Sequence, residues 1–171
     1  MNTTRSSVHH YFVLLVATAA LFAFSLSCKK DTPTDPAVLT SLQGTWKLTS
    51  LNVSPAYLSL TDLAGGLNAL EGNCLGQATV TFTAAGAITN NVSSVAACST
   101  AAKSKELVNA FFSSATTYAE TNNQVVLTTG SRVVTASKVF TATTATMVTQ
   151  LDVDPGNNPV KTTYTVVLTK Q

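Results

Sequence analysis

Cysteine and histidine carry the most versatile side chains for catalysis and metal binding, and both are scarce in this chain of 171 residues. The two histidines, His9 and His10, lie near the N-terminus, and none follows them. Ser-His-Asp and Cys-His catalysis need an imidazole to accept the proton of the nucleophile, and many zinc sites use imidazole ligands. The chain after His10 therefore lacks the residue on which these chemistries depend.

The acidic residues do not suggest a catalytic pair. Asp62, Glu71, Glu106 and Glu120 are scattered singly, and their simplest interpretation is as solvated surface charges. Charged residues make up 11% of the chain, the net charge is +2, and no basic stripe of the kind that neutralises phosphates is present. No phosphate-binding loop or nucleophile motif appears either. We therefore expect no enzyme, no cofactor and no nucleic-acid partner.

One stretch, residues 152–158 (DVDPGNN), has oxygen-bearing side chains at alternating positions, as calcium loops do. It lacks the downstream glutamate that binds calcium through both carboxylate oxygens. A plain hairpin turn explains the same residues, because Pro and Gly are the strongest turn signals. We therefore predict a turn here and no metal site.

The first of the three cysteines, Cys28, ends a segment that resembles the signal of bacterial lipoproteins. A single charge, Arg5, precedes an uncharged run over residues 11–24, which is shorter than the about 20 residues that a membrane-spanning helix needs. The small or apolar residues before Cys28 are similar to a lipobox, in which the thiol receives a diacylglycerol before cleavage. The resemblance implies a lipoprotein signal peptide over residues 1–27 and lipid attachment at Cys28. A cleaved signal with an incidental cysteine and an uncleaved anchor helix are the alternatives.

This resemblance also implies a place in the cell. The chain would be anchored by its lipid to a membrane of the cell envelope. Of the two membranes, we expect the outer one, on its periplasmic or surface face. Residues 28–39 contain two prolines and several charges, a composition typical of a flexible tether. Outside the cytoplasm, the pair Cys74 and Cys98 predicts a disulfide. Two free thiols or a two-ligand metal site remain as alternatives.

The elements that must position these residues are predicted from alternation. Threonine- and valine-rich stretches with alternating apolar side chains are typical of half-buried strands. We predict eight strands, at residues 45–54, 77–83, 87–93, 114–121, 124–129, 132–141, 145–153 and 160–170. A helix is predicted over residues 99–112, capped by Ser99 or Thr100, and a second short helix over residues 58–70. Short strands joined by tight turns predict an all-β fold, an eight-stranded up-and-down antiparallel barrel with one or two short helices.

Residues 42–50 (LQGTWKLTS) resemble the first strand of lipocalin-like (calycin) domains of lipoproteins from Gram-negative bacteria, whose Gly-x-Trp opening is matched by Gly44 and Trp46. Further elements follow in the same order, namely Cys74, a strand ending in Phe82 with Gly86 in its turn, Cys98, a hairpin at Asn122-Asn123, and a last strand ending in Lys170. The resemblance covers about residues 40–171. It implies that Trp46 packs across the closed end of the barrel beside Lys170, a cation–π contact of about 0.5–1 kcal/mol.

Five inward-facing side chains could line a ligand cavity or simply fill the core: Phe82, Tyr118, Phe140, Met147 and Tyr164. The first hypothesis is therefore a lipid-anchored lipocalin-like binding protein that holds a small apolar or amphipathic ligand. The alternative is a structural or accessory interaction lipoprotein with a filled core and no small-molecule ligand. The membrane, through the lipid, and a small apolar ligand are the expected partners, and the sequence identifies no protein partner.

Overall fold

Strands form where buried and exposed side chains alternate, as β7 illustrates. Val134, Ala136 and Lys138 of this strand are buried, and the residues between them are exposed. The computed structural model describes residues 37–57, 59–153 and 160–171, which belong to one compact unit. Its strands are β1 (Gly44–Tyr57), β2 (Leu60–Asp62), β3 (Thr79–Phe82), β4 (Ile88–Asn90), β5 (Thr116–Glu120), β6 (Gln124–Thr129), β7 (Arg132–Phe140), β8 (Thr144–Val153) and β9 (Val160–Lys170). The predicted signal peptide and Cys28, the tether up to residue 36 and most of the predicted 152–158 turn lie outside the described residues.

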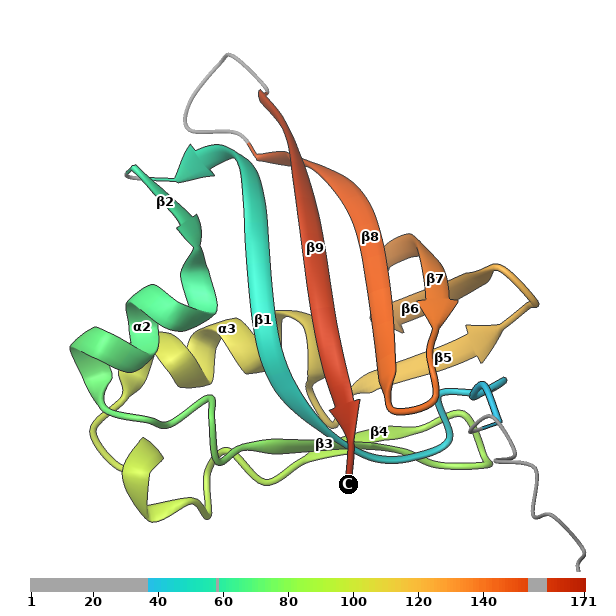
Figure 1. The fold of residues 1–171 in the computed structure, drawn as a ribbon, viewed down its shortest axis with the longest axis horizontal. Helices are drawn as coiled ribbons and strands as arrows, with labels where there is room; N and C mark the ends of the chain where they lie inside the picture. The colour runs from blue at the N-terminus through green and yellow to red at the C-terminus, as the bar shows by residue number, and fades with distance from the viewer. Residues whose placement is uncertain (1–36, 58, 154–159) are drawn as a thin grey trace, which may run out of the picture. The chain divides into compact units, whose positions relative to one another are not determined.

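The strands form one antiparallel sheet that curls into a nearly closed barrel (Figure 1). Their order is β4-β3-β1-β9-β8-β7-β6-β5, and the extra strand β2 pairs with β1 outside this path. A bridge between Ala87 and Thr117 joins the two ends, where the N–H of Tyr118 donates to the carbonyl of Gly86 over 2.7 Å. The predicted eight-stranded up-and-down barrel is therefore confirmed. Strand β2 was not predicted, because its three residues are all exposed and show no alternation.

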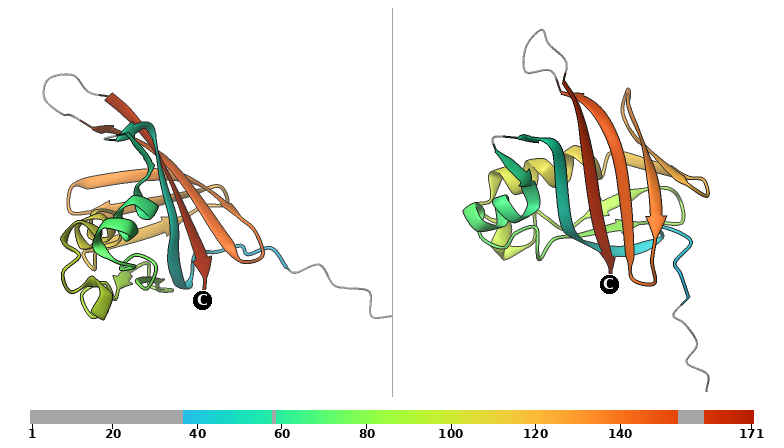
Figure 2. Two further views of the ribbon diagram at one scale, coloured as in Figure 1. Left: turned by 60° about the vertical axis from the view of Figure 1, so that its left-hand side comes forward. Right: turned by 45° about the horizontal axis from the view of Figure 1, so that its top comes forward.

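In the described part of the chain, two helices, α2 (Leu63–Glu71) and α3 (Ala102–Phe112), and a short 3-10 turn η1 (Ala96–Cys98) accompany the sheet. Both helices lie on the same side of the barrel (Figure 2). They begin for different reasons. The carboxylate of Asp62 caps α2 by accepting from the N–H of Gly65 over 3.0 Å. Asp62 is thus a helix cap as well as an exposed charge.

The predicted cap of α3 by Ser99 or Thr100 is wrong. Ala101 occupies the cap position, and its side chain has no oxygen to offer. The carboxylate of Glu71, at the end of α2, accepts instead from the backbone N–H groups of Lys103 and Ser104 at 3.0 and 2.7 Å, and from the Ser104 hydroxyl at 2.8 Å. Glu71 was predicted to be a solvated charge, and it is the residue that joins the two helices.

The predicted disulfide is confirmed between Cys74 and Cys98, which are 0% and 1% exposed. It links the segment after α2 to η1, just before α3. Closing a loop of this length is worth roughly 3 kcal/mol in the chain-entropy model. Together with the Glu71 cap, it attaches the start of α3 to the rest of the domain.

One end of the barrel is closed by a stack of rings and ammonium groups. The Nζ of Lys170 lies 4.5 Å from the ring centroid of Trp46, as predicted. The ring centroids of Trp46 and Phe140 are 6.4 Å apart, and the two rings are stacked. A second cation–π contact places the Nζ of Lys138 4.8 Å from the Phe140 centroid. Gly44 permits this arrangement, because its φ is +111° and a Cβ at this position would collide with the Lys170 ammonium.

Glu120 completes the closed end, so its prediction as a solvated charge is wrong. Its Oε1 lies 2.8 Å from the Lys138 Nζ, and the two side chains are 17% and 2% exposed. The same carboxylate accepts from the N–H of Leu42 and the hydroxyl of Ser41, at 3.0 and 2.9 Å. The N–H of Leu39 donates to the carbonyl of Thr141. The chain thus enters the barrel at its closed end.

Candidate functional site

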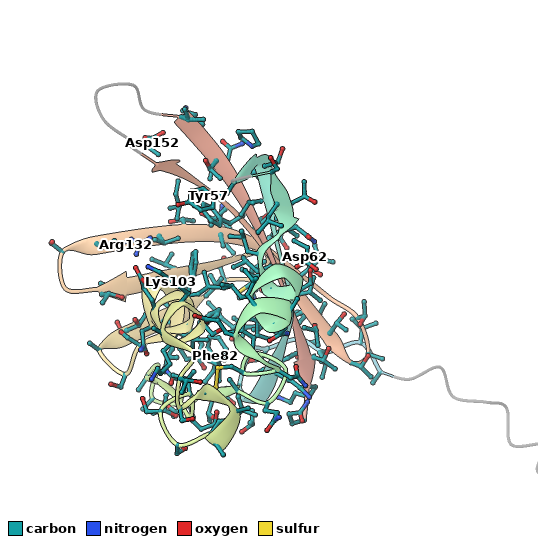
Figure 3. All side chains as sticks on the ribbon, turned by 90° about the vertical axis from the view of Figure 1, so that its left-hand side faces the viewer. Tyr57, Asp62, Phe82, Lys103, Arg132 and Asp152 are labelled. Carbon is teal, nitrogen blue, oxygen red and sulfur yellow. A yellow bond between two sulfur atoms is a disulfide. The ribbon has the colours of Figure 1, made fainter. Side chains whose placement is uncertain are left out.

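A groove opens at the opposite end of the long strands. It has a volume of about 770 Å³ and lies where β1 and β8 end and where β7 and β9 begin. Helix α3 forms the facing wall. Apolar side chains dominate the lining, among them Tyr57, Leu63, Leu107, Phe111, Leu151 and Tyr164. Figure 3 looks at this face of the molecule, with Tyr57 and Asp152 above Arg132 and Lys103.

Strand register explains which side chains face the groove. Leu151 of β8 lies opposite Thr162 of β9, and Thr149 lies opposite Tyr164. Directly opposed residues of an antiparallel pair project to the same side, so these positions share the inner face. From the other wall, Leu107 and Phe111 are four residues apart and therefore lie on one face of α3. The apolar face predicted for this helix covers the core and also borders the groove.

The floor of the groove is aromatic. The rings of Phe111 and Tyr164 have centroids 5.7 Å apart, and Phe111 also packs on Phe112 at 6.2 Å. The series continues into the core, where Phe112 meets Phe82 at 6.0 Å and Phe82 meets Tyr118 at 5.1 Å. Because these rings pack in the interior beneath Phe111, the groove above them is where a ligand has room.

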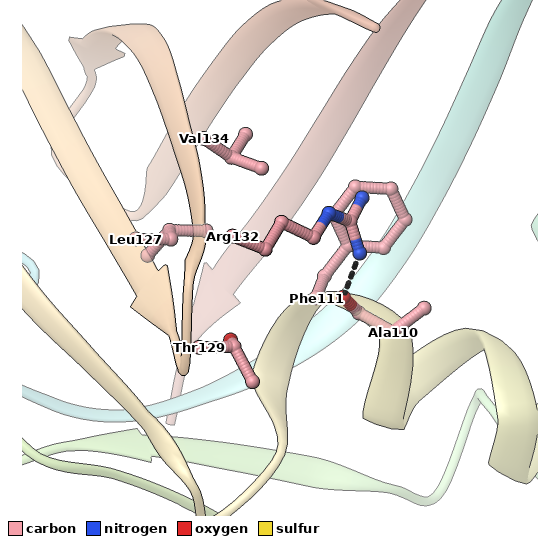
Figure 4. A pocket seen from close by; sticks show the side chains of 6 residues that line it. All are labelled: Ala110, Phe111, Leu127, Thr129, Arg132 and Val134. Atoms are coloured by element: carbon pink, nitrogen blue, oxygen red, sulfur yellow. Dashed lines mark hydrogen bonds between the residues drawn. The ribbon is translucent and has the colours of Figure 1, made fainter. Parts of the chain in front are cut away.

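Arg132 is the cation that lines the groove. It is the first residue of β7, and its Nη1 donates to the carbonyl of Ala110 on α3 over 3.1 Å (Figure 4). Arg132, Ala110 and Phe111 also border a small adjoining void of about 10 Å³. The strand wall and the helix wall of the groove are joined at this point.

The charge of Arg132 reaches the Tyr164 hydroxyl. Burial raises the pKa of Tyr164 above its usual value of 10.0, Arg132 lowers it, and Tyr57 raises it again. Two acidic residues, Glu106 and Asp152, also border the groove. Glu106 is paired with Lys103 at 2.9 Å, and both of these side chains are 71% exposed. The groove thus combines apolar walls with a few polar groups, the composition usual for small-molecule sites.

Of the five side chains predicted to line a ligand cavity, Tyr164 is the one that lines the groove. Phe82 and Met147 are 1% and 3% exposed and belong to the core. The Tyr118 hydroxyl donates to the carbonyl of Thr83 over 2.8 Å, so this ring closes the barrel seam, and burial raises the pKa of Tyr118. Phe140 lies in the closed-end stack. The structure brings Phe82 and Tyr118 into contact with each other and places both away from the groove.

Sequence reasoning did not assign Phe111, Leu107, Tyr57 or Arg132 to a site. The two α3 residues were visible as an apolar helix face, which could equally have packed on the core. Tyr57 and Arg132 lie at strand ends, where no periodic pattern marks them. Their common position depends on the curvature of the sheet and on where α3 crosses it.

Comparisons of the chain with protein-family models, with curated proteins and with solved structures found no match. Among the described residues, no three side chains of the His, Cys, Asp or Glu type are grouped so that they could hold a metal ion. Neither described helix has the length and apolarity that crossing a membrane requires.

Proposed function

We propose that this protein is a lipid-anchored, lipocalin-like binding protein that holds a small apolar or amphipathic ligand in the groove between α3 and the ends of β1, β8 and β9. The observation that supports ligand binding is the groove itself. Its volume of about 770 Å³ falls within the range of about 300–1,000 Å³ that is typical of small-molecule sites.

Partly exposed apolar side chains at the groove give a ligand something to cover. Tyr57 is 58% exposed, Val160 43% and Leu60, next to the groove on β2, 39%. Each Å² of apolar surface that a ligand withdraws from water contributes about 25 cal/mol. The filled interior restricts binding to this end, so the ligand is held by a surface groove and the helix beside it.

Ala110 offers a direct test, because it is exposed, lies on α3 and lines the groove. Ala110→Trp should place an indole in the groove without disturbing the core. Ala102→Trp is the matched control, an exposed alanine of the same helix outside the groove lining. The full chain in lipid nanodiscs would be titrated with N-phenyl-1-naphthylamine, using empty nanodiscs as the blank.

We expect the wild-type protein and Ala102→Trp to bind this probe equally, and Ala110→Trp to bind it at least about tenfold more weakly, a loss of about 1.4 kcal/mol. Circular dichroism spectra that match for all three proteins would show that the fold is retained. Equal binding by the two tryptophan variants, or no binding above the blank, would reject the groove as a ligand site.

The anchor is a separate part of the proposal and is supported by the sequence before Cys28. Cys28→Ala should abolish incorporation of labelled fatty acid and leave the precursor uncleaved. The double variant Cys74→Ala/Cys98→Ala should still incorporate the fatty acid and still be cleaved. Normal lipid labelling of the Cys28→Ala protein would contradict the anchor. Its loss would not affect the groove proposal, because the groove residues all come from residues 55–164.

The alternative is a structural or accessory interaction lipoprotein with a filled core. The complete burial of Trp46, Phe82 and Leu168 supports it, since the barrel interior holds side chains where a ligand would otherwise sit. This function predicts that Ala110→Trp has no effect on the activity of the protein in its host. A ligand that copurifies with the wild type and is lost from Ala110→Trp would favour the binding protein instead.

A further inference from the structure

The position of Arg132 limits the chemistry of the ligand. Its guanidinium carries five N–H donors, and the hydrogen bond to the Ala110 carbonyl uses one nitrogen, Nη1. The ion pairs within the described ranges are Lys103–Glu106 and Lys138–Glu120, so no carboxylate there pairs with Arg132. A cation at the edge of an apolar groove retains donors that a ligand can use.

The acidic residues beside the groove do not cancel this charge. Glu106 is committed to Lys103 and is largely in water. Asp152 is exposed and lies opposite Lys161 in the β8–β9 register, so these two residues project to the same side. The Arg132 guanidinium lowers the pKa of Tyr164, as a positive charge near the phenol does. Arg132 therefore brings a positive charge close to the aromatic floor of the groove.

The hydrogen bond to α3 also orients the guanidinium. The carbonyl of Ala110 belongs to the last turn of the helix, where partial negative charge favours a cation. Phe111 and Leu127 flank the same small void, so the Arg132 stem lies along apolar surface while its head remains polar. A planar guanidinium held in this way can form two parallel hydrogen bonds to a carboxylate or phosphate.

We propose that the groove takes a single-chain amphiphile with an anionic head group, which binds Arg132 while the apolar chain lies against Leu107, Phe111 and Tyr164. This rests on the proposed binding function and adds the charge and orientation of the ligand. A carboxylate and a phosphate monoester would satisfy the same donors. Tyr57 and Val160 also line the groove, so they offer further apolar surface to the chain of the ligand.

Four single-chain ligands of ten carbons separate the contributions: the anions decanoate and decyl phosphate, the neutral decanol and the cation decyltrimethylammonium. Calorimetric titration of the full chain in nanodiscs, corrected with empty nanodiscs, should rank decanoate and decyl phosphate first. Arg132→Met should weaken decanoate binding by about tenfold to a hundredfold, the range for a hydrogen bond to a charged group. It should leave decanol binding unchanged, which also shows that the groove remains intact.

Lys47→Met is the matched control, because Lys47 lies on β1 between two buried residues and outside the groove lining. It should bind decanoate like the wild type. Arg132→Lys should restore part of the affinity, since it keeps the charge and loses the planar fork. If decanoate and decanol bind equally and Arg132→Met changes neither, the anionic head group is wrong while the binding function stands. Preference for decyltrimethylammonium would likewise overturn the head-group assignment, and failure of all the ligands to bind would reject the binding function itself.

Discussion

The buried ion pair at the closed end should respond unequally to the loss of each partner. Lys138 is 2% exposed, and its Nζ lies 2.8 Å from Glu120 and 4.8 Å from the centroid of Phe140. Glu120→Gln removes the negative partner and leaves an ammonium group that has almost no access to water. Lys138→Met leaves a carboxylate that still accepts from the Leu42 N–H and the Ser41 hydroxyl, and that is 17% exposed.

The magnitudes follow from these surroundings. Removing one member of a buried pair costs about 3–5 kcal/mol, and the Phe140 ring should keep Glu120→Gln near the lower end, at about 3 kcal/mol. Lys138→Met should cost about 1 kcal/mol, because methionine replaces the apolar stem of lysine and the remaining carboxylate keeps two donors. The double variant should resemble Lys138→Met, which gives a coupling free energy of about 3 kcal/mol.

Urea unfolding of the wild-type protein and the three variants measures these free energies. The fluorescence of Trp46, the only tryptophan, reports on the closed end because its ring stacks on Phe140. Far-UV circular dichroism reports on the whole barrel, and the two signals should change together. The reasoning would be refuted if Lys138→Met cost as much as Glu120→Gln, or if the costs of the two substitutions simply added in the double variant.

Three further predictions concern the helices and the first strand. Hydrogen bonds from the start of α3 hold the pKa of Glu71 below its usual value of 4.5. The contribution of Glu71 to stability is therefore present above pH 4.5 and is lost as the pH falls through the lowered pKa. In Glu71→Gln, the free energy of unfolding should depend less steeply on pH in this range. Replacing Cys74 and Cys98 with alanine should lower the free energy of unfolding by roughly 3 kcal/mol, measured by thermal unfolding, and an unchanged value would contradict the structural role of the bond. Gly44→Ala should destabilise the protein more than Gly72→Ala. Both glycines have positive φ, but the added methyl group would collide with the Lys170 side chain at position 44 and would meet no atom at position 72. Equal urea midpoints for the two variants would contradict this.

Alternation predicts those strands best that are long and face the core on one side. Strand β6 was predicted with its observed bounds, Gln124–Thr129, and β9 likewise, Val160–Lys170. The predicted strands 77–83 and 87–93 shorten to β3 and β4, because the ends of a strand depend on whether a neighbour supplies hydrogen bonds. The Asn91 side chain, for example, accepts from the N–H of Thr79 over 2.7 Å where β3 begins. No local pattern encodes such partners.

The same limit applies to the polar residues that hold the fold together. Glu71 caps a helix that begins about thirty residues later in the chain. Glu120 accepts a hydrogen bond from the N–H of Leu42, which lies 78 residues earlier. Each looks like an isolated surface acid in the sequence. Their roles appear only when the barrel and the helix bring their partners to them, which is why reading acids by local context failed for both.

The groove was the least predictable feature, for a related reason. Alternation identifies Phe82, Met147 and Tyr164 equally as inward-facing, but it does not show where side chains run out and a space remains. That depends on α3, whose rings Phe111 and Phe112 fill the barrel from one side and leave the strand ends beyond them uncovered. Phe82 packs on Phe112 of the helix and Met147 is buried in the core, whereas Tyr164 packs on Phe111 at the groove.

The two ends of the barrel differ in a way that suits the proposed function. At the closed end, cations, rings and a carboxylate satisfy one another, and the chain enters there through Leu39 and Leu42. At the open end, α3 is attached at its start by Glu71 and the disulfide, and at its last turn by hydrogen bonds from Arg132 to Ala110 and from Asn90 to Phe112. A ligand that engages Arg132 therefore acts directly on one of the hydrogen bonds that hold the last turn of the helix. Binding at the groove can adjust the end of α3 without contacting the closed end, because no residue of the closed-end stack lines the groove.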